Sequence, residues 1–298
     1  MKKISKHIKR LPLLLVPILI GLQGCYEDES ITLGDLPTQT APVTNLDKFL
    51  FAEFQQKHNC MVRYKFVDRY VDDSKRVTPP DKDIVGPYMT FVRDYWAGPF
   101  YQTDAGSNEL IHKHYPAEIV LIGSPMYNQD GTVTLGTADA GVRITLTEVN
   151  NFNLNNTSWI RRQLHVMQHE FTHIIHQNYD LPNGYQKISE GDYSGPAWTI
   201  KTDEEMLKLG FVTPYASNNP NEDFAELVAH ILTMGADGFN AKYIDITGET
   251  DPDIIKGKLT IKEKYESAVK YYREKLNIDL ENLQANAWAK ITGTSQSN

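Results

Sequence analysis

Short stretches of alternating apolar and polar residues mark the first half of the chain, and this period of two predicts β-strands. In the clearest stretch, Ile144 and Leu146 alternate with Thr145 and other polar residues, so one face of that strand should be buried and the other wet. A turn is expected at residues 128–131, which read Asn-Gln-Asp-Gly. The predicted strands are Met61–Val67, Glu118–Ile122, Thr132–Leu135 and Val142–Val149.

A period of about 3.6 residues replaces this alternation elsewhere, and it predicts amphipathic helices. The predicted helices are Asn45–Gln56, Val85–Trp96, Thr157–Tyr179, Phe224–Met234 and Ile261–Leu276. Strands and helices therefore mix in residues 44–180, whereas residues 181–298 should form a helical lobe. This order predicts an α+β fold with a mixed β-sheet.

The helix predicted at Thr157–Tyr179 carries two different stripes. The apolar stripe should face the core, and it consists of Ile160, Leu164, Met167, Phe171 and Ile174. Four histidines lie on nearly the opposite side: His165, His169, His173 and His176. Imidazoles gathered on one face of a helix are candidate metal ligands.

The first 24 residues have the pattern of a secretory signal peptide. Five cations and no acid accompany the apolar run Leu11–Leu22, which is too short to cross a bilayer comfortably. Residues 22–25, Leu-Gln-Gly-Cys, resemble the bacterial lipobox. That resemblance implies cleavage before Cys25 and lipidation of this cysteine, so that acyl chains would anchor the mature protein in a membrane.

Residues 25–43 are expected to form a tether between the anchor and the folded domain. The acidic segment Tyr26–Ser30 is either a solvated linker or, by resemblance, the export signal of a surface lipoprotein. Residues 31–43 contain glycine, prolines and threonines without apolar periodicity, as flexible linkers do. The resemblance implies a location on the outer membrane, exposed at the cell surface.

Charge and cysteine content limit the partners and the redox chemistry. The chain has a formal net charge of −8, and loss of a signal with five cations and no acid makes this −13. An acidic surface of this kind argues against nucleic acid as a partner. Cys60 is the only cysteine besides Cys25, so the lipidated protein can form no intramolecular disulfide.

Residues 169–173, His-Glu-Phe-Thr-His, have the spacing of zinc hydrolases. Histidines four residues apart lie about 6 Å apart on one helix face, so the imidazoles of His169 and His173 can bind one ion. Glu170 is turned by about 100° from His169, which lets it reach a metal-bound water instead of the ion. There it can take a proton from the water and later pass it to a leaving amine.

The setting of this motif strengthens the prediction, because the pattern alone arises by chance in roughly one chain in a hundred. The motif lies in an amphipathic helix of an exported chain and follows an expected edge strand at Val142–Val149. A straight helix cannot bring three successive turns to one ion. The other histidines are therefore expected to lie at the surface or to support the ligands: His112, His114, His165, His176 and His230.

A catalytic zinc site needs a third protein ligand and one open position. The metzincin spacing is absent, because the positions that would hold its glycine and third histidine carry His176 and Tyr179. Downstream, Glu222 and Glu226 fall on one face of a helix. Either could bind the ion while the other holds an imidazole from behind.

Residues 215–226, Tyr-Ala-Ser-Asn-Asn-Pro-Asn-Glu-Asp-Phe-Ala-Glu, resemble the downstream motif of the zincins related to anthrax lethal factor. In that family the first glutamate of the Glu-x-Phe-Ala-Glu run binds zinc, and a tyrosine seven residues earlier donates a hydrogen bond to the oxyanion. The resemblance implies Glu222 as the third ligand, Tyr215 as the oxyanion donor and Glu226 as a supporting acid. It also implies a zincin-like, gluzincin-like metallopeptidase domain over residues 44–298.

The lipobox, the His-Glu-Phe-Thr-His motif and the late acidic motif together resemble the substrate import-associated zinc metallohydrolase lipoproteins. Such proteins are found beside TonB-dependent nutrient importers. The resemblance covers the signal and residues 157–235. It implies Zn²⁺ as the cofactor, a peptide or protein as the substrate, and an importer complex as a partner.

Two functions from different classes therefore remain open. The first is a cell-surface zinc peptidase in which Glu170 activates water, although the same groups could hydrolyse another amide or an ester. The second is a zinc-containing lipoprotein that holds a nutrient for an importer without cutting it. A purely structural zinc site fits less well, because such sites usually have four ligands rich in cysteine.

Overall fold

The computed structural model describes residues 42–65, 75–127, 133–134, 136–139 and 142–293. By their contacts, the residues from Pro42 onward group into one unit. The predicted signal peptide, the lipidation site Cys25, most of the tether and the turn at 128–131 lie outside the described residues. Within the described part, no helix combines the length and the apolar character that crossing a bilayer requires.

Four strands form the main sheet, in the order β1-β2-β6-β5. The first three run parallel, with Met61 opposite Glu118 and Glu118 opposite Arg143, whereas β5 is antiparallel to β6. The main-sheet strands are β1 (Met61–Arg63), β2 (Glu118–Leu121), β5 (Gly136–Asp139) and β6 (Arg143–Leu146). A separate antiparallel pair consists of β3 (Met126–Tyr127) and β4 (Val133–Thr134).

Two expectations about the strand β6 are wrong. It does not lie at the edge of the sheet, because β5 pairs with its free side. Its polar face is not wet either, since Thr145 is 4% exposed and Thr147 is fully buried. A strand inside a largely parallel sheet is covered on both faces, whatever the alternation of its sequence suggests.

Helices make up most of the remaining structure. The helices of the N-terminal part are α1 (Asn45–Leu50), η1 (Phe51–Gln55), α2 (Gln56–His58), α3 (Lys82–Phe91), η3 (Val92–Ala97), α4 (Gly98–Thr103) and α5 (Ala105–His114). The later helices are η4 (Val149–Asn151), α6 (Thr157–Tyr179), α7 (Tyr185–Ile188), η5 (Gly195–Ile200), α8 (Asp203–Lys208), η6 (Tyr215–Asn218), α9 (Pro220–Phe239), η7 (Asn240–Ile244), α10 (Pro252–Lys275) and α11 (Leu280–Thr292). The fold is α+β with a helical C-terminal region, as predicted.

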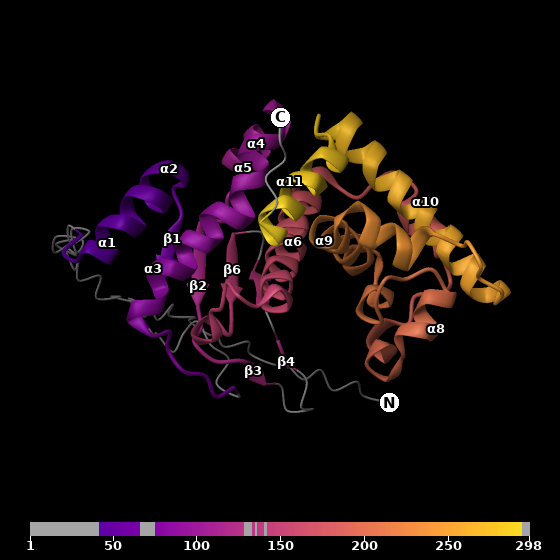
Figure 1. The fold of residues 1–298 in the computed structure, drawn as a ribbon, viewed down its shortest axis with the longest axis horizontal. Coiled ribbons are helices and arrows are strands. Elements are labelled where there is room, and N and C mark those ends of the chain that lie inside the picture. Colours follow the sequence, from indigo (N-terminus) through magenta and orange to yellow (C-terminus); the bar gives the residue numbers. More distant parts are fainter. Residues whose placement is uncertain (1–41, 66–74, 128–132, 135, 140–141, 294–298) are drawn as a thin grey trace, which may run out of the picture. The chain divides into compact units, whose positions relative to one another are not determined.

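The helix α6 lies between the sheet and α9 (Figure 1). Its N-cap is Asn156, whose side chain accepts a hydrogen bond from the backbone N–H of Trp159 (3.1 Å) and satisfies an otherwise free donor. On its apolar stripe, Phe171 packs its ring against the rings of Trp96 and Phe100. The opposite, histidine-bearing side packs on α9 rather than facing water, and His169 is only 6% exposed.

The helix α9 is interrupted near its C-terminal end. Gly235 has φ +69°, a conformation that favours glycine, and the ring of Trp288 from α11 packs directly on it. A Cβ atom at this position would lie 2.8 Å from that ring. The straight part of α9 that faces α6 therefore ends before this glycine.

Candidate metal centre

The candidate metal centre is built at the seam between α6 and α9. His173 on α6 meets Glu222 on α9, and His165, two turns earlier, meets Glu226, one turn later. The two helices are therefore antiparallel, and successive turns of the seam bring polar side chains together. Their spacing of four residues on each helix keeps these side chains on facing surfaces.

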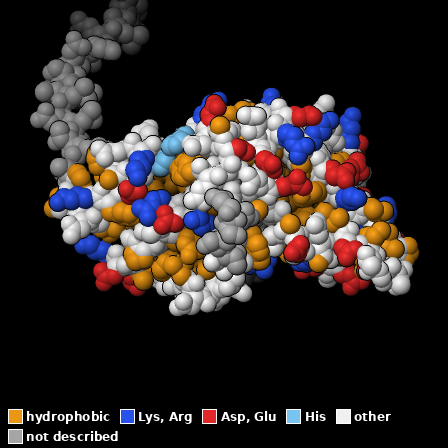
Figure 2. Space-filling view, turned by 45° about the horizontal axis from the view of Figure 1, so that its top comes forward, with side chains coloured by type: hydrophobic (Ala, Val, Ile, Leu, Met, Phe, Trp, Pro, Cys, Tyr) orange, Lys and Arg blue, Asp and Glu red, His pale blue; other side chains and the backbone are white. Residues whose placement is uncertain are grey.

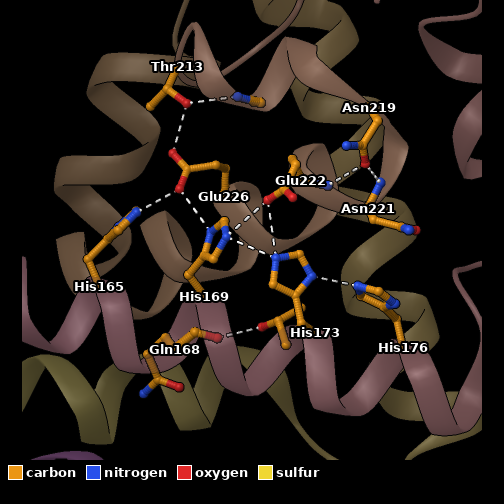
Figure 3. Close-up of polar contacts among 12 residues, drawn as sticks. His165, Gln168, His169, His173, His176, Thr213, Asn219, Asn221, Glu222 and Glu226 are labelled. Carbon is orange, nitrogen blue, oxygen red and sulfur yellow. Dashed lines mark hydrogen bonds and ion pairs between the residues drawn. The ribbon is translucent and has the colours of Figure 1, made fainter. Parts of the chain in front are cut away.

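Three predicted ligands converge in this seam (Figure 3). The Nε2 atoms of His169 and His173 are 3.0 Å apart, and each lies 3.1 Å from Oε2 of Glu222. Ligands of a tetrahedral zinc with bonds of about 2.0–2.1 Å are separated by about 3.3 Å, so this triangle has close to the size that one ion requires. Two imidazoles and one carboxylate are also donors that zinc accepts.

Glu222 owes its position to the start of α9. Asn219 caps the helix, and its Oδ1 accepts hydrogen bonds from the backbone N–H groups of Asn221 (2.9 Å) and Glu222 (3.1 Å). The first turn of a helix favours a carboxylate because of the helix dipole. Burial alone would raise the pKa of Glu222, but the hydrogen bonds with His169 and His173 outweigh it and lower the pKa to about 2.

Glu226 lies behind His169, away from the three converging atoms. Its Oε1 is 2.9 Å from Nδ1 of His169, although the N–H direction is not well aligned with it, and 2.9 Å from Nε2 of His165. Its Oε2 accepts a hydrogen bond from the hydroxyl of Thr213 (2.8 Å). Burial would lower the pKa of His169, but Glu222 and Glu226 raise it to about 10.

His176 contacts His173 on the side away from the three converging atoms, as Glu226 does for His169. Its Nε2 lies 2.7 Å from Nδ1 of His173. If His173 keeps Nε2 unprotonated for a metal, its Nδ1–H donates to His176, which must then be neutral. Burial, followed by the charge of His173, lowers the pKa of His176 to about 4, so this histidine is neutral at physiological pH.

A second group of potential ligands adjoins the first and consists of His165, Glu226 and His230. Nδ1 of His230 donates to the backbone carbonyl of Glu226 (2.9 Å) and is 4.0 Å from the nearest carboxylate oxygen of this residue. Both oxygens of Glu226 already accept hydrogen bonds. This group therefore supports His169 rather than forming a second converging triangle.

Tyr215 lies beside His169, and the charge of Glu170 acts on both of these side chains. The ring of Tyr215 stacks on that of His169 with centroids 5.8 Å apart, and the ring of Trp198 packs edge-on against it at 4.9 Å. Burial raises the pKa of Tyr215, and the nearby carboxylates of Glu222 and Glu170 raise it further. The structure thus brings the predicted base and the predicted oxyanion donor to one place, and their chemical roles remain predictions.

Known proteins similar to this chain identify the family to which it belongs. A family model described as "Putative zinc-binding metallo-peptidase" matches residues 39–281, which is most of the chain. The chain belongs to this family. A crystal structure of a putative zinc-binding metallo-peptidase from Bacteroides caccae is also similar, with 29% sequence identity and a TM-score of 0.68. The similarity covers 85% of this chain and 94% of that one, whereas no curated protein matches.

The zinc-binding description of this metallopeptidase family agrees with the donor set found at the seam. The motif spacing pointed to His169 and His173, but it left Glu222 and Glu226 as alternatives for the third position. The structure places Glu222 among the converging atoms and Glu226 behind them. The contribution of Thr213 was missed, because no sequence pattern connects this loop residue to the helices.

The remaining histidines lie away from the converging atoms. His114 has a ring nitrogen 2.9 Å from the hydroxyl of Tyr179, and His112 packs against the rings of His58 and Tyr101. Neither belongs to the groups of potential metal ligands among the described residues. His165 and His176 support the site, which was one of the two roles expected for them.

Proposed function

We propose that this member of the zinc-binding metallopeptidase family hydrolyses peptide bonds at the seam between α6 and α9. The convergence of His169, His173 and Glu222 within 3.1 Å of one another carries the proposal. Two further residues support it: the ring of Tyr215 stacks on that of His169, and the charge of Glu170, which directly follows His169, acts on both side chains. Zinc is the ion proposed, and these three side chains would hold it.

Each residue has one task in the proposed reaction. Bound zinc would supply a Lewis acid that polarises the scissile carbonyl and acidifies water. Glu170 takes a proton from the attacking water and gives it to the leaving amine. Tyr215 keeps its proton because burial raises its pKa, and its hydroxyl donates a hydrogen bond to the oxyanion that develops in the transition state.

The supporting residues fix the imidazoles in the orientation that binding requires. Glu226 lies behind His169, and His176 lies behind His173. Contacts of this kind determine which ring nitrogen carries the proton and in which direction the unprotonated nitrogen points. Their part in the reaction is to position the ligands.

The proposed setting is the cell surface, and it rests on residues outside the described part. Cleavage before Cys25 and its lipidation would anchor the protein in the outer membrane, where it could trim peptides for a TonB-dependent importer. The acidic net charge supports small peptides or proteins as partners rather than nucleic acid. On the face shown in Figure 2, Lys and Arg side chains are interspersed with Asp and Glu and form no single cationic patch.

The variant Glu170→Gln tests the proposal against the alternative of a nutrient-binding lipoprotein. Glutamine keeps the size of the side chain but cannot accept the proton, so we expect cleavage of a mixed peptide library to fall by about 10²–10⁴-fold. Zinc content should stay at the wild-type level, and Glu266→Gln on α10 serves as a matched control. If the wild type cleaves no peptide and the variant sustains importer-dependent uptake fully, the protein acts as a binder and not as a peptidase.

A further inference from the structure

A polar hollow of about 650 Å³ opens beside the metal centre. It lies between the end of α6, the segment before α7 and the start of α9. His176, which is hydrogen-bonded to His173, forms one wall, and Asn221, which directly precedes Glu222, forms another. A substrate side chain next to the scissile bond can therefore reach this hollow.

The lining of the hollow suits a cation with several N–H groups. It contains one carboxylate, from Asp180, and none of the described lining residues is Lys or Arg. The remaining polar side chains are the imidazole of His176 and the amides of Gln177, Asn183, Gln186 and Asn221. Carboxylate and amide oxygens accept hydrogen bonds, and a charge-assisted bond from a guanidinium or ammonium group is stronger than a neutral one.

Asp180 is held in an unusual backbone conformation. Its φ of 61° and ψ of 175° fall in a region that is nearly restricted to glycine. The position directly follows the last residue of α6, and the hydroxyl of Tyr271 donates a hydrogen bond to the carbonyl of Asp180 (2.8 Å). A glycine would end the helix there without strain, so the presence of aspartate points to a use for its carboxylate.

We propose that this hollow is a specificity pocket for a lysine or arginine side chain of the substrate, with Asp180 as the carboxylate that recognises it. The proposal rests on the proposed peptidase function and adds the class of substrate to it. The cationic residue is placed next to the scissile bond, because the hollow shares His176 and Asn221 with the surroundings of the metal ligands. The amides would complete the hydrogen bonds of the cation.

The test compares peptides that differ only in one residue near the scissile bond, lysine in one and glutamine in the other. With the purified full-length protein loaded with zinc, we expect kcat/KM for the lysine peptide to be about tenfold higher or more. Asp180→Asn should reduce this ratio to about twofold or less. Asp253→Asn removes an exposed aspartate from α10 and should leave the ratio unchanged.

Asp180→Gly separates the carboxylate from the backbone conformation. If Asp180 recognises a cation, this variant loses the preference for lysine although relief of strain raises its Tm. Retention of the preference in Asp180→Asn or Asp180→Gly would overturn the proposal, as would a wild-type preference for acidic or apolar residues.

Binding of the same peptides to Glu170→Gln distinguishes failure of the pocket from failure of the peptidase proposal. Suppose that the protein cleaves no peptide but binds the lysine peptide more tightly than the glutamine peptide, and that Glu170→Gln/Asp180→Asn loses this difference. This result contradicts only the peptidase function. Equal binding of both peptides overturns the pocket itself.

Discussion

Glu222 and Asp223 are neighbours on α9, but they enter two polar clusters of different composition. Asp223 lies 2.7 Å from the ammonium group of Lys264, and both side chains are almost fully buried. The hydroxyl of Tyr193 donates a second hydrogen bond to this aspartate (3.0 Å). Among the described residues, in contrast, the ion-pair partners of Glu222 are the histidines His169 and His173.

The difference separates a structural cluster from a functional one. Lys264 supplies a cationic group opposite Asp223, so the pair is complete within the chain and ties α9 to α10, although burial lowers the pKa of Lys264. Histidines are positively charged only when they are protonated, so the cluster around Glu222 must take up either protons or a metal ion. A half-buried carboxylate whose ion-pair partners are imidazoles therefore indicates a metal site more strongly than burial alone does.

The largest expected effect comes from removing the cation of the structural cluster. Lys264→Met leaves Asp223 buried without a cationic partner, and we expect the free energy of unfolding in urea to fall by about 3–5 kcal/mol. An exposed lysine of the same helix provides the control, and Lys256→Met should change stability by less than about 0.5 kcal/mol. Equal stability of the two variants would contradict the assignment of a structural role to the pair.

A smaller effect is expected behind the metal ligands. His176→Ala removes the acceptor that orients His173, so zinc affinity should fall by about 10–100-fold, as measured by competition with a chelator. Stability of the metal-free protein should fall much less than in Lys264→Met. His112→Ala removes an exposed histidine elsewhere and should bind zinc like the wild type. An unchanged zinc affinity in His176→Ala would show that this residue does not orient His173.

The smallest effect is the pH dependence of the metal-free protein. The pKa of His169 is raised from 6.5 to about 10, so its contribution to stability is complete below pH 6.5 and is lost as the pH rises through 10. The pKa of Glu222 is lowered from 4.5 to about 2, so its contribution is present above pH 4.5 and is lost as the pH falls through 2. The two contributions come from one interaction and must not be added.

Thermal unfolding of the metal-free protein between pH 5 and 10 measures this contribution. We expect stability to decline on the alkaline side in the wild type and to decline less in His169→Ala. Zinc should reverse the trend, because binding displaces the proton of His169 and is favoured as the pH rises. The same alkaline decline in both proteins would show that His169 does not hold the proton.

Local features of the sequence predicted the local part of the site. The spacing of His169, Glu170 and His173 needs only helix geometry, and the helix runs over the predicted residues, Thr157–Tyr179. The choice between Glu222 and Glu226 depends on how α9 lies against α6, which no residue pattern specifies. The resemblance to a known motif favoured Glu222, and the structure places this residue among the converging atoms.

The predictions that failed depend on tertiary neighbours. Alternation in Val142–Val149 predicted one wet face, but Thr145 on that face is buried. The strand was also expected at the edge of the sheet, but β5 pairs with it. Likewise, the sequence could not decide whether His165 and His176 are exposed or support the ligands, since that depends on contacts with Glu226 and His173. No sequence pattern pointed to Asp180, because its backbone conformation depends on where α6 ends and on the hydrogen bond from Tyr271.

The zinc content of the protein from residue 42 onward, measured by mass spectrometry of the metal at neutral pH, tests the central claim most directly. We predict about one zinc ion per chain in the wild type and in Glu226→Gln, and almost none in Glu222→Gln. A wild-type protein without zinc, or equal zinc in Glu222→Gln and the wild type, would contradict the assignment of His169, His173 and Glu222 as a metal centre.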